Sequence, residues 1–571
     1  MRYIKKLAMF IVVILFFAAC TAAASPTTKP YTIMIYMNGS DLESDFGAAT
    51  TDLIEMLESG LDSRHANIVI LTGGTNRWQN DVIPANECVI WEMADGWLYE
   101  VDSMGLVNMG EPSTLRDFIK YSMEHFPGNK YGLIMWDHGG GSIAGFGHDE
   151  KFNDDALTLR DMKLAFEEAG LRDNKLEFLG FDACLMATVE MAVLAADYAH
   201  VMIASEDLEP GDGWDYVFLG ALNCDPNMNG FDLGKVIVDT FMDFYGPDSD
   251  ELLSLSVVDL ARVGPVMDTM GRLMGLASGS IKTKESPSFY QLAERRGITK
   301  TFGEGSPRDN YSDMVDVGDM AVMLECFFPR EAAAVIHALN RCVVYNRHNS
   351  DIELFGLSTF YVYGGKSEGV HSLRTYSDLE MDEAYTQYLH HFFNGLVNHK
   401  DKSAPNLRSE LVLWQPISQN RYRMAGLLQT SEPAHDLLWP RLNDRPVGMY
   451  PVATTAHSRL YAVPAQINGR EGDIMISFSP HHPQGHVRGV RYNDGYVIQK
   501  GYDPIETGDK IALYALEWDF DKDTVEKNWS KSDVFTVTDG IALTWSTAPQ
   551  GHRLGYRHTD VCHHVEYTLP F

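Results

Sequence analysis

The sequence predicts an α/β sandwich built on a mostly parallel sheet, followed by an all-β domain. From Tyr31 to about Tyr363, short and almost wholly apolar runs alternate with amphipathic stretches of helical period. Apolar runs of this kind are typical of parallel strands that helices cover on both faces. After about Lys402 the period changes to two, and clusters of Gly, Asn, Asp and Pro separate the runs, which is typical of antiparallel strands. A chain of 571 residues also exceeds what one hydrophobic core usually serves.

The pattern places the elements in order along the chain. In the first region, strands are predicted at Tyr31–Met37, Asn67–Thr72, Tyr131–Asp137, Leu176–Phe181, His200–Ala204, Ser254–Val258 and Gly356–Tyr361. Helices are predicted at Asp41–Glu58, Ser113–His125, Leu159–Ala169, Leu185–Ala195, Tyr311–Glu325, Pro329–Tyr345 and Leu379–His399, with a less regular insertion at about 275–315. In the second region, strands are predicted at Leu411–Trp414, Arg421–Leu427, Leu460–Pro464, Asp473–Phe478, Gly495–Gln499 and Lys510–Glu517.

The N-terminus has the pattern of an export signal. A positive start with Arg2, Lys5 and Lys6 precedes a short apolar run that ends in Ala-Ala-Cys20. This predicts a lipoprotein signal peptide (1–19), lipidation of Cys20, and a flexible tether (20–30) before the first domain (31–400) and the all-β domain (405–571). The protein would then be exported and held on an outer membrane or cell surface. An ordinary signal peptide cut after Ala24 is the alternative.

The formal charge of the chain is −33, which argues against nucleic acid or an anionic membrane surface as a partner. A negative surface favours cationic substrates at long range, although high solubility alone also explains it. Six cysteines follow Cys20, but their spacings assign no disulfide.

Two predicted strand ends carry residues suited to catalysis. The first strand runs into Asp137-His138-Gly139 and two further glycines, and the second ends at Asp182 just before Cys184. Ligands bind outside the carboxyl ends of strands in open α/β sheets, so a histidine there is placed for proton transfer. A cysteine that opens the helix Leu185–Ala195 would feel the positive end of the helix dipole, which lowers a thiol pKa. A structural turn and a buried small residue are the alternative interpretations.

At these segments the chain resembles the clostripain-like cysteine peptidases, relatives of caspases, legumains and gingipains. The resemblance lies in Met135-Trp-Asp-His-Gly-Gly-Gly141 and Gly180-Phe-Asp-Ala-Cys-Leu-Met186, in the segment 31–41, and in the segment 204–216. The separation of about 45 residues between the histidine and the cysteine is also similar to that in caspases. The resemblance implies a caspase-like three-layer α/β/α fold over 31–400, and it does not extend to the all-β domain.

The resemblance also implies a mechanism. Cys184 would attack the scissile carbonyl to form an acyl-enzyme, His138 would transfer protons, and the N–H groups of Gly139 and Cys184 would form the oxyanion hole. Cleavage after Arg or Lys would use Asp182 and Asp212 in the S1 pocket. A helix cap and a turn residue are the alternatives for these two carboxylates.

Other expectations concern maturation, cations and competing functions. The resemblance implies possible self-cleavage after a basic residue, for which Lys151 is a candidate. It also implies possible calcium binding, for which the acidic stretch Asp149–Asp155 is a candidate, although no cofactor is required. No metal site is expected, because the histidine clusters near 481–486 and 562–564 lack ligand spacing. The expected partners are proteins or peptides with basic residues. The alternatives are a peptidase with a non-basic P1 preference and a non-catalytic surface lipoprotein that uses the fold as a binding module.

Overall fold

A computed structural model describes residues 27–246, 249–283, 287–304, 312–364, 366–398, 404–418, 420–429, 438–492, 500–520, 528–562 and 565–568. The predicted signal peptide, Cys20, most of the tether and the predicted strand Gly495–Gln499 lie outside the described residues. Among the helices that the structure describes, none is both long enough and apolar enough to cross a membrane.

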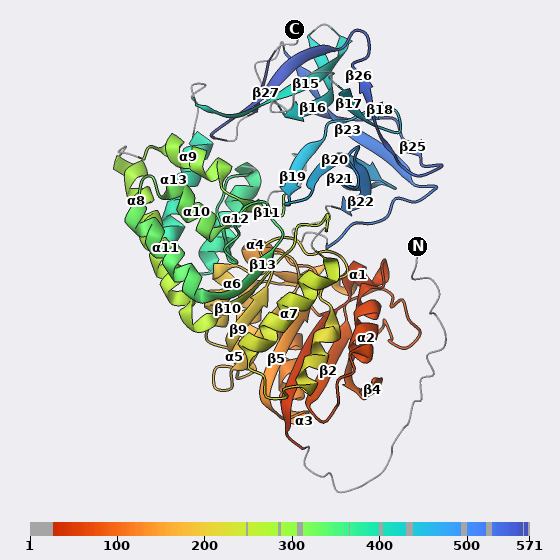
Figure 1. The fold of residues 1–571 in the computed structure, drawn as a ribbon, viewed down its shortest axis with the longest axis vertical. Helices are drawn as coiled ribbons and strands as arrows, with labels where there is room; N and C mark the ends of the chain where they lie inside the picture. The colour runs from red at the N-terminus through yellow and green to blue at the C-terminus, as the bar shows by residue number, and fades with distance from the viewer. Residues whose placement is uncertain are drawn as a thin grey trace.

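A nine-stranded mixed sheet forms the centre of the first region, in the order β13-β10-β9-β8-β5-β1-β2-β3-β4 (Figure 1). The run β9-β8-β5-β1-β2 is parallel, and the strands outside it are antiparallel. The strands that match predictions are β1 (Lys29–Asn38), β2 (Ala66–Gly73), β5 (Gly128–Trp136), β8 (Leu176–Asp182), β9 (Ala199–Ala204) and β10 (Ser254–Asp259). The pattern missed β3 (Cys88–Ala94), β4 (Trp97–Gly105) and β13 (Val343–His348). β13 begins within the helix predicted over Pro329–Tyr345, because the observed helix ends at Cys342.

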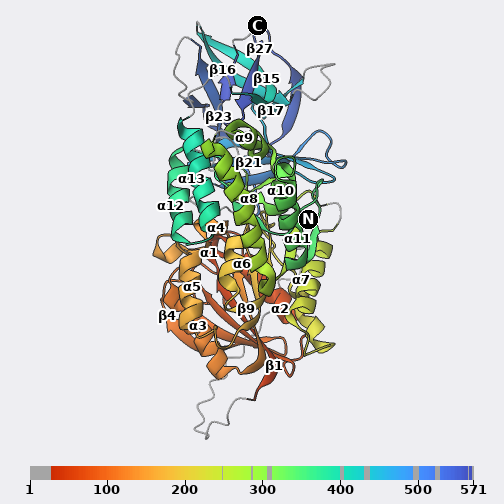
Figure 2. The same cartoon turned by 90° about the vertical axis from the view of Figure 1, so that its left-hand side faces the viewer.

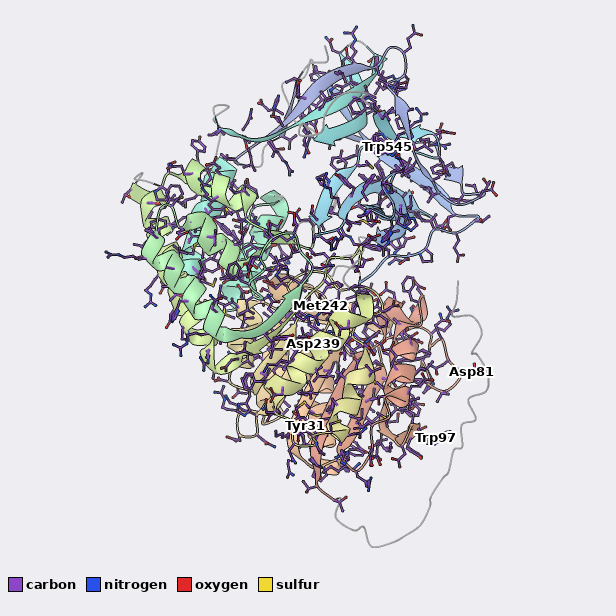
Figure 3. The ribbon with its side chains drawn as sticks, viewed as in Figure 1. Tyr31, Asp81, Trp97, Asp239, Met242 and Trp545 are labelled. Atoms are coloured by element: carbon purple, nitrogen blue, oxygen red, sulfur yellow. The ribbon has the colours of Figure 1, made fainter. Side chains whose placement is uncertain are left out.

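Alternate residues of the central strands enter two different cores. Tyr36 and Leu133 pack on the side of α3 (Pro112–His125), α5 (Leu159–Glu168) and α6 (Val189–Ala195). Ile35 and Ile134 pack on the other side, with α2 (Ala48–Glu58) and α7 (Gly230–Tyr245). Figure 2 shows the two helix layers on either side of the sheet, and in Figure 3 Asp239 and Met242 mark α7. Alternation of this kind follows from the two-residue period of a strand.

A helical lobe continues the chain beside the sheet (Figure 1). It comprises α8 (Val263–Thr283), α9 (Phe289–Ile298), α10 (Val317–Leu324), α11 (Pro329–Cys342), α12 (Lys366–Asp378) and α13 (Glu383–Asn398). The expectation of a less regular insertion at 275–315 is therefore wrong over much of its length. The buried residues Met270, Leu273, Met274 and Ala277 of α8 keep a helical period through the glycines that obscured it. The predicted strand Gly356–Tyr361 appears as β14 (Ser358–Phe360), but it pairs with β12 (Met314–Asp316) in a separate sheet that also holds β11 (Thr301–Phe302).

Other helix boundaries also differ from the predictions. One helix was expected over Asp41–Glu58, but the structure has α1 (Ser40–Ser44) and α2, because Gly47 between them has a positive φ of 70°. The capping box predicted for the helix at Leu159 is confirmed, with Thr158 and Asp161 capping each other. Short elements follow β5: α4 (Gly141–Ala144), β6 (Phe146–Asp149) and β7 (Asp155–Leu157).

From residue 406 onward, the described elements are strands (Figure 1). An eleven-stranded sheet has the path β22-β21-β20-β23-β16-β15-β27-β28, with β19, β24 and β25 attached, and β18-β17-β26 form a second sheet. Their bounds are β15 Asn406–Ser418, β16 Arg421–Gln429, β17 Leu438–Leu442, β18 Arg445–Pro446, β19 Tyr450–Thr454, β20 Arg459–Ile467, β21 Arg470–Phe478, β22 His486–Tyr492, β23 Lys510–Asp519, β24 Asn528–Lys531, β25 Phe535–Thr536, β26 Leu543–Thr547, β27 Arg553–Asp560 and β28 Val565–Tyr567. The predicted fold class, a three-layer α/β/α sandwich with an all-β C-terminal region, is confirmed. The sheet expected to be mostly parallel is mixed, with five parallel strands at its centre and antiparallel pairings at both edges.

Candidate active site

Four loops meet at one edge of the large sheet, because parallel strands all end on the same side. β1 leads into the short helix α1, which carries Asp41, and β5 leads directly into His138. β8 ends at Asp182, two residues before Cys184, and β9 leads into the loop of Glu209. The structure therefore brings the two residues predicted for catalysis to the same edge.

The imidazole of His138 is buried, and both of its ring nitrogens have partners. Nε2 lies 2.7 Å from Asp41 Oδ1, and Nδ1 accepts a hydrogen bond of 3.0 Å from the backbone N–H of Lys500. The ring also stacks on His148, with centroids 5.2 Å apart. Burial alone would raise the pKa of Asp41, but His138, His148 and Arg470 together hold it well below its usual range. A charged Asp41 fixes the ring with Nε2–H toward the carboxylate, which leaves Nδ1 for proton transfer.

Asp137 anchors the loop that presents this histidine. Its buried carboxylate accepts hydrogen bonds from Asn38 Nδ2 at 2.7 Å, Ser40 Oγ at 2.6 Å and the N–H of His148 at 2.9 Å. Burial is the largest influence on Asp137 and raises its pKa to about 7. The carboxylate thus joins the end of β1 to both sides of the loop after β5.

Cys184 lies in a turn after β8 and not at the start of a helix. The next helix, α6, begins at Val189 with Thr188 as its cap, because Leu185 has a positive φ of 63° that a helix does not allow. The thiol is fully buried, and its sulfur accepts a hydrogen bond from the N–H of Glu209 at 3.2 Å. Burial, followed by the Glu209 charge, raises the pKa of Cys184 to about 12. The expected helix Leu185–Ala195 is therefore wrong at its start, and so is the lowered thiol pKa derived from it.

Gly139 packs directly on the backbone of Cys184. A Cβ atom at position 139 would lie 1.9 Å from the carbonyl oxygen of Cys184 and 3.0 Å from its nitrogen, so only glycine fits. In the part of the chain that the structure describes, the N–H groups of Gly139 and Cys184 are not used by another hydrogen bond. His138 and Cys184 also share no hydrogen bond with each other. Two free N–H groups therefore lie beside the thiol.

A buried acidic pocket lies next to Cys184, and the side chain of Lys500 fills it. The Lys500 ammonium contacts the Asp182 carboxylate and lies 3.4 Å from Glu209 Oε2, and none of the three side chains is exposed. The other oxygen of Asp182 accepts hydrogen bonds from the Tyr216 hydroxyl at 3.1 Å and the Trp214 N–H at 3.3 Å. Burial alone would lower the pKa of Lys500, but Asp182 and Glu209 outweigh it and raise the pKa above its usual value.

The walls of this pocket fit an extended cationic side chain. The ammonium of Lys500 lies 5.9 Å from the ring centroid of Trp136, within reach of a cation–π contact. The Trp136 indole N–H in turn donates to the buried carboxylate of Asp52 at 2.5 Å. A Cβ atom at Gly213, where φ is +60°, would lie 2.7 Å from the Lys500 ammonium nitrogen. The pocket is therefore narrow at its acidic end.

Asp212 and Lys151 lie outside this pocket. Asp212 is exposed and forms no ion pair with Lys500, and Glu209 of the same loop occupies the position opposite the ammonium. Lys151 lies in a short 3-10 turn (Glu150–Phe152), where its ammonium donates to the Asn76 carbonyl at 3.4 Å.

The acidic stretch proposed for calcium uses its carboxylates in local hydrogen bonds. Asp149 accepts from the N–H groups of Met109 and Lys151, both at 2.8 Å, and Asp155 accepts from Asn108 at 2.6 Å. Calcium binding there stays a prediction. Over the described residues, the set of three possible metal ligands that gathers closely is Asp41, His138 and His148, with ligand atoms within 4.8 Å of one another. This set contains the histidine of the site and its orienting carboxylate.

Three residues of the site were not predicted from the sequence. Asp41 lies in α1 just after the end of β1, and the sequence pattern predicts a helix there without marking a site residue. Glu209 lies in the segment that carried the resemblance, where Asp212 between two glycines was chosen instead. Lys500 gives no local signal, because its role depends on contact with residues more than 300 positions earlier.

A protein-family model matches the region of the chain that carries this site. The model of the clostripain family, peptidase group C11, matches residues 35–395. The chain belongs to the clostripain family. The match covers the large sheet, the four loops of the site and the helical lobe, and it ends before the C-terminal strands.

Individual proteins with similarity to this chain were also found. The chain is 26% identical to clostripain of Hathewaya histolytica over 223 residues, which cover 32% of this chain and 40% of clostripain. It also resembles a secreted C11 cysteine protease from Bacteroides thetaiotaomicron, solved with an irreversible peptide inhibitor (15% identity, 63% of this chain and 99% of that chain, TM-score 0.47). An inactive zymogen C11 protease from Parabacteroides distasonis is similar at 18% identity, with 64% and 99% covered and a TM-score of 0.48.

Proposed function

We propose that this protein is a cysteine endopeptidase that hydrolyses peptide bonds after Lys or Arg. The observation that carries the proposal is the lysine ammonium buried between Asp182 and Glu209, in a pocket next to Cys184. A buried pair of carboxylates binds a cationic side chain strongly and leaves an unpaired charge when a neutral side chain enters. The alternative preference for a non-basic P1 residue finds no support in such a pocket.

The reaction follows from the groups around the pocket. His138 Nδ1 takes the proton of the Cys184 thiol, and the sulfur attacks the carbonyl carbon of the P1 residue. The carbonyl oxygen becomes an oxyanion that the N–H groups of Gly139 and Cys184 stabilise. The C–N bond then breaks, His138 gives the proton at Nδ1 to the leaving amine, and a thioester remains on Cys184. Water attacks the thioester while His138 Nδ1 takes a proton from that water, the C–S bond breaks as the acid product leaves, and His138 returns the proton to the Cys184 sulfur.

Asp41 acts on this reaction through the histidine. Its carboxylate holds Nε2–H of His138 at 2.7 Å, which directs Nδ1 toward the pocket where Lys500 now lies. The carboxylate also stabilises the imidazolium that forms when His138 takes a proton. Asp41 is therefore a positioning residue, and His138 and Cys184 are the catalytic residues.

A panel of fluorogenic peptides that differ only at P1 tests the proposal. The full-length chain and its Lys500→Ala variant are assayed in parallel, with Cys184→Ala as the control in each background. Turnover confined to Lys and Arg peptides, and absent without Cys184, is the expected result. Turnover of neutral P1 peptides at equal rates would contradict the acidic S1 pocket. Inactivity of both forms on the whole panel would instead favour a binding lipoprotein.

We also propose that the chain is exported and attached to a membrane through lipid on Cys20. The small residues before Cys20 and the polar segment after it support this location. Fractionation of cells that produce the wild type and Cys20→Ser tests it. The wild type should sediment with membranes, and the variant should not; equal distribution of the two would contradict lipid anchoring.

A further inference from the structure

The C-terminal β region contributes the residue that fills the S1 pocket. Lys500 follows β22 in the chain, and its ammonium lies between Asp182 and Glu209 of the peptidase region. Its backbone N–H donates a hydrogen bond to Nδ1 of His138, the nitrogen assigned to proton transfer. One residue of the β region therefore engages both the specificity pocket and the catalytic histidine.

The backbone of Lys500 is not placed for cleavage of the bond that follows it. In a productive complex, the leaving nitrogen would face His138, and that nitrogen belongs to Gly501 when Lys500 is in S1. In the structure, the nitrogen on His138 belongs to Lys500 itself. Within the described residues, Gly139 and Cys184 donate no hydrogen bond to the Lys500 carbonyl, whose oxygen would lie 3.9 Å from a Cβ atom at Gly211. The side chain of Lys500 lies where the P1 side chain of a substrate would lie, but its backbone does not take the position of a substrate backbone.

The backbone after Lys500 fits closely against the loop that lines the pocket. Gly501 has a φ of +76°, and a Cβ atom there would lie 2.8 Å from the Cα of Gly211 and 2.9 Å from its nitrogen. A side chain at position 501 would therefore both strain the backbone and push the two loops apart. The close approach shows that this segment is seated against the loop 209–213.

Three arginines of the β region reinforce the contact with the acidic peptidase surface. Arg488 pairs with Glu251 and lies 3.6 Å from Asp250. Arg470 lies 3.6 Å from Asp41. Arg491, also in β22, donates to the Glu304 carbonyl at 2.7 Å. The β region thus presents several cations to the peptidase region of a chain whose net charge is −33.

We infer that the C-terminal β region is a built-in inhibitor of the peptidase, with Lys500 as a lysine plug that occupies S1 in a register that is not cleaved. This inference rests on the proposed function, since it names how that same site is kept inactive. No covalent step is required for inhibition or for its relief. A substrate with Lys or Arg at P1 competes with the plug for Asp182 and Glu209, and movement of the segment 500–503 opens the site.

Steady-state kinetics with a Lys-P1 peptide tests the inference. The full-length wild type is compared with Lys500→Ala, with Lys500→Arg, and with Lys510→Ala as the matched control, because Lys510 is exposed at the start of β23. Lys500→Ala should raise kcat/KM by about tenfold or more, because a pocket that is filled most of the time lowers apparent affinity by the same factor. Lys500→Arg should stay inhibited, since it keeps the cation, and Lys510→Ala should match the wild type.

A second variant keeps the lysine and changes only its seating. Gly501→Ala should also raise kcat/KM, because its methyl group cannot fit against Gly211. If the wild type and both variants cleave the peptide, but neither Lys500→Ala nor Gly501→Ala has a higher kcat/KM than the wild type, the plug is refuted and the proposed function stands.

The accessibility of the Cys184 thiol can be measured without catalysis, so it tests the lysine plug independently of peptidase activity. Alkylation of Cys184 by iodoacetamide is followed by mass spectrometry of the peptide that contains it, because the thiol is fully buried in the closed form. Labelling should be faster in Lys500→Ala than in the wild type and in Lys510→Ala, even if no peptide is cleaved. Equal labelling rates in all three forms would overturn the plug. Faster labelling without any peptidase activity would support the plug and count against the peptidase.

Discussion

Asp182 and Lys500 stand 318 positions apart in the sequence and form an ion pair in which neither side chain is exposed. Taking two charges out of water is costly, and the cost is repaid only where further hydrogen bonds satisfy the same groups. Here Tyr216 and Trp214 donate to the second oxygen of Asp182, and the Glu209 carboxylate lies 3.4 Å from the ammonium. An acidic pocket built with this support is suited to a cation whether or not the cation belongs to the same chain.

Glu209 and Asp212, two of the acidic residues in the segment 204–216, should differ in their effect on specificity. In the Lys500→Ala background, Glu209→Gln should lower kcat/KM for Lys-P1 peptides by about 10- to 100-fold, because a buried charge-assisted contact is lost. Asp212→Asn should change it by less than about threefold, since an exposed carboxylate interacts weakly. Measurements of kcat/KM on the same peptide check both. A larger effect at Asp212 would restore the assignment made from the sequence.

Gly139→Ala should abolish most activity without unfolding the chain. The added Cβ atom would meet the Cys184 carbonyl oxygen at 1.9 Å, which displaces the two N–H groups from the oxyanion. Loss of one oxyanion-hole donor typically costs about 10²–10³ in kcat. Burst and steady-state kinetics in the Lys500→Ala background measure the effect, and circular dichroism checks the fold. Unchanged kcat in a folded variant would remove Gly139 from the mechanism.

Asp41→Asn should reduce kcat far more than it changes KM. The amide keeps the shape of the side chain but no longer holds His138 in the tautomer with Nδ1 free, a change that costs on the order of 10²–10⁴ in kcat. A pH profile of kcat supplies the second readout, because loss of a purely structural contact would leave the shape of that profile unchanged. A variant that changes only KM would place Asp41 in substrate binding instead.

The same substitution should flatten the response of stability to acid. The pKa of Asp41 lies below its unfolded value of about 3.9, so its contribution to stability is present above that pH and is lost as the pH falls through the lower folded value. The Asp41→Asn variant lacks this contribution already at neutral pH. Its free energy of unfolding should therefore fall less than that of the wild type between pH 5 and pH 2. Urea unfolding at several pH values measures both forms. Parallel curves for the two proteins would show that Asp41 is not stabilised by His138.

The sequence predicted the strand ends that carry His138 and Asp182 because the pattern there is local. Apolar runs that end at His138 and Asp182 locate two strand ends, and the topology of a parallel sheet then brings them together. The start of α6 was not predictable in this way, since it depends on the left-handed backbone of Leu185 in a run of helix-forming residues. The antiparallel strand β4 was missed because most of its side chains are exposed or half-buried at the edge of the sheet.

Contacts between the β region and the peptidase region cannot be predicted from the hydrophobic period or from local motifs. Lys500 lies among turn residues of an antiparallel region, and no period or motif marks it as different from the other lysines. The choice between Glu209 and Asp212 likewise depended on which carboxylate turns inward, and several acidic residues of that loop have the same local surroundings. Both features are set by tertiary packing.

Because Lys500 and its pocket belong to one polypeptide, their encounter is intramolecular. Tethered groups meet at an effective concentration that reaches the millimolar range for short flexible linkers, and this concentration does not change when the protein is diluted. A secreted enzyme that carried its inhibitor as a separate chain would become active as it diffused away. This protein would keep its resting state at any dilution, and a substrate would have to approach that effective concentration, or bind through residues beyond P1, to displace the lysine.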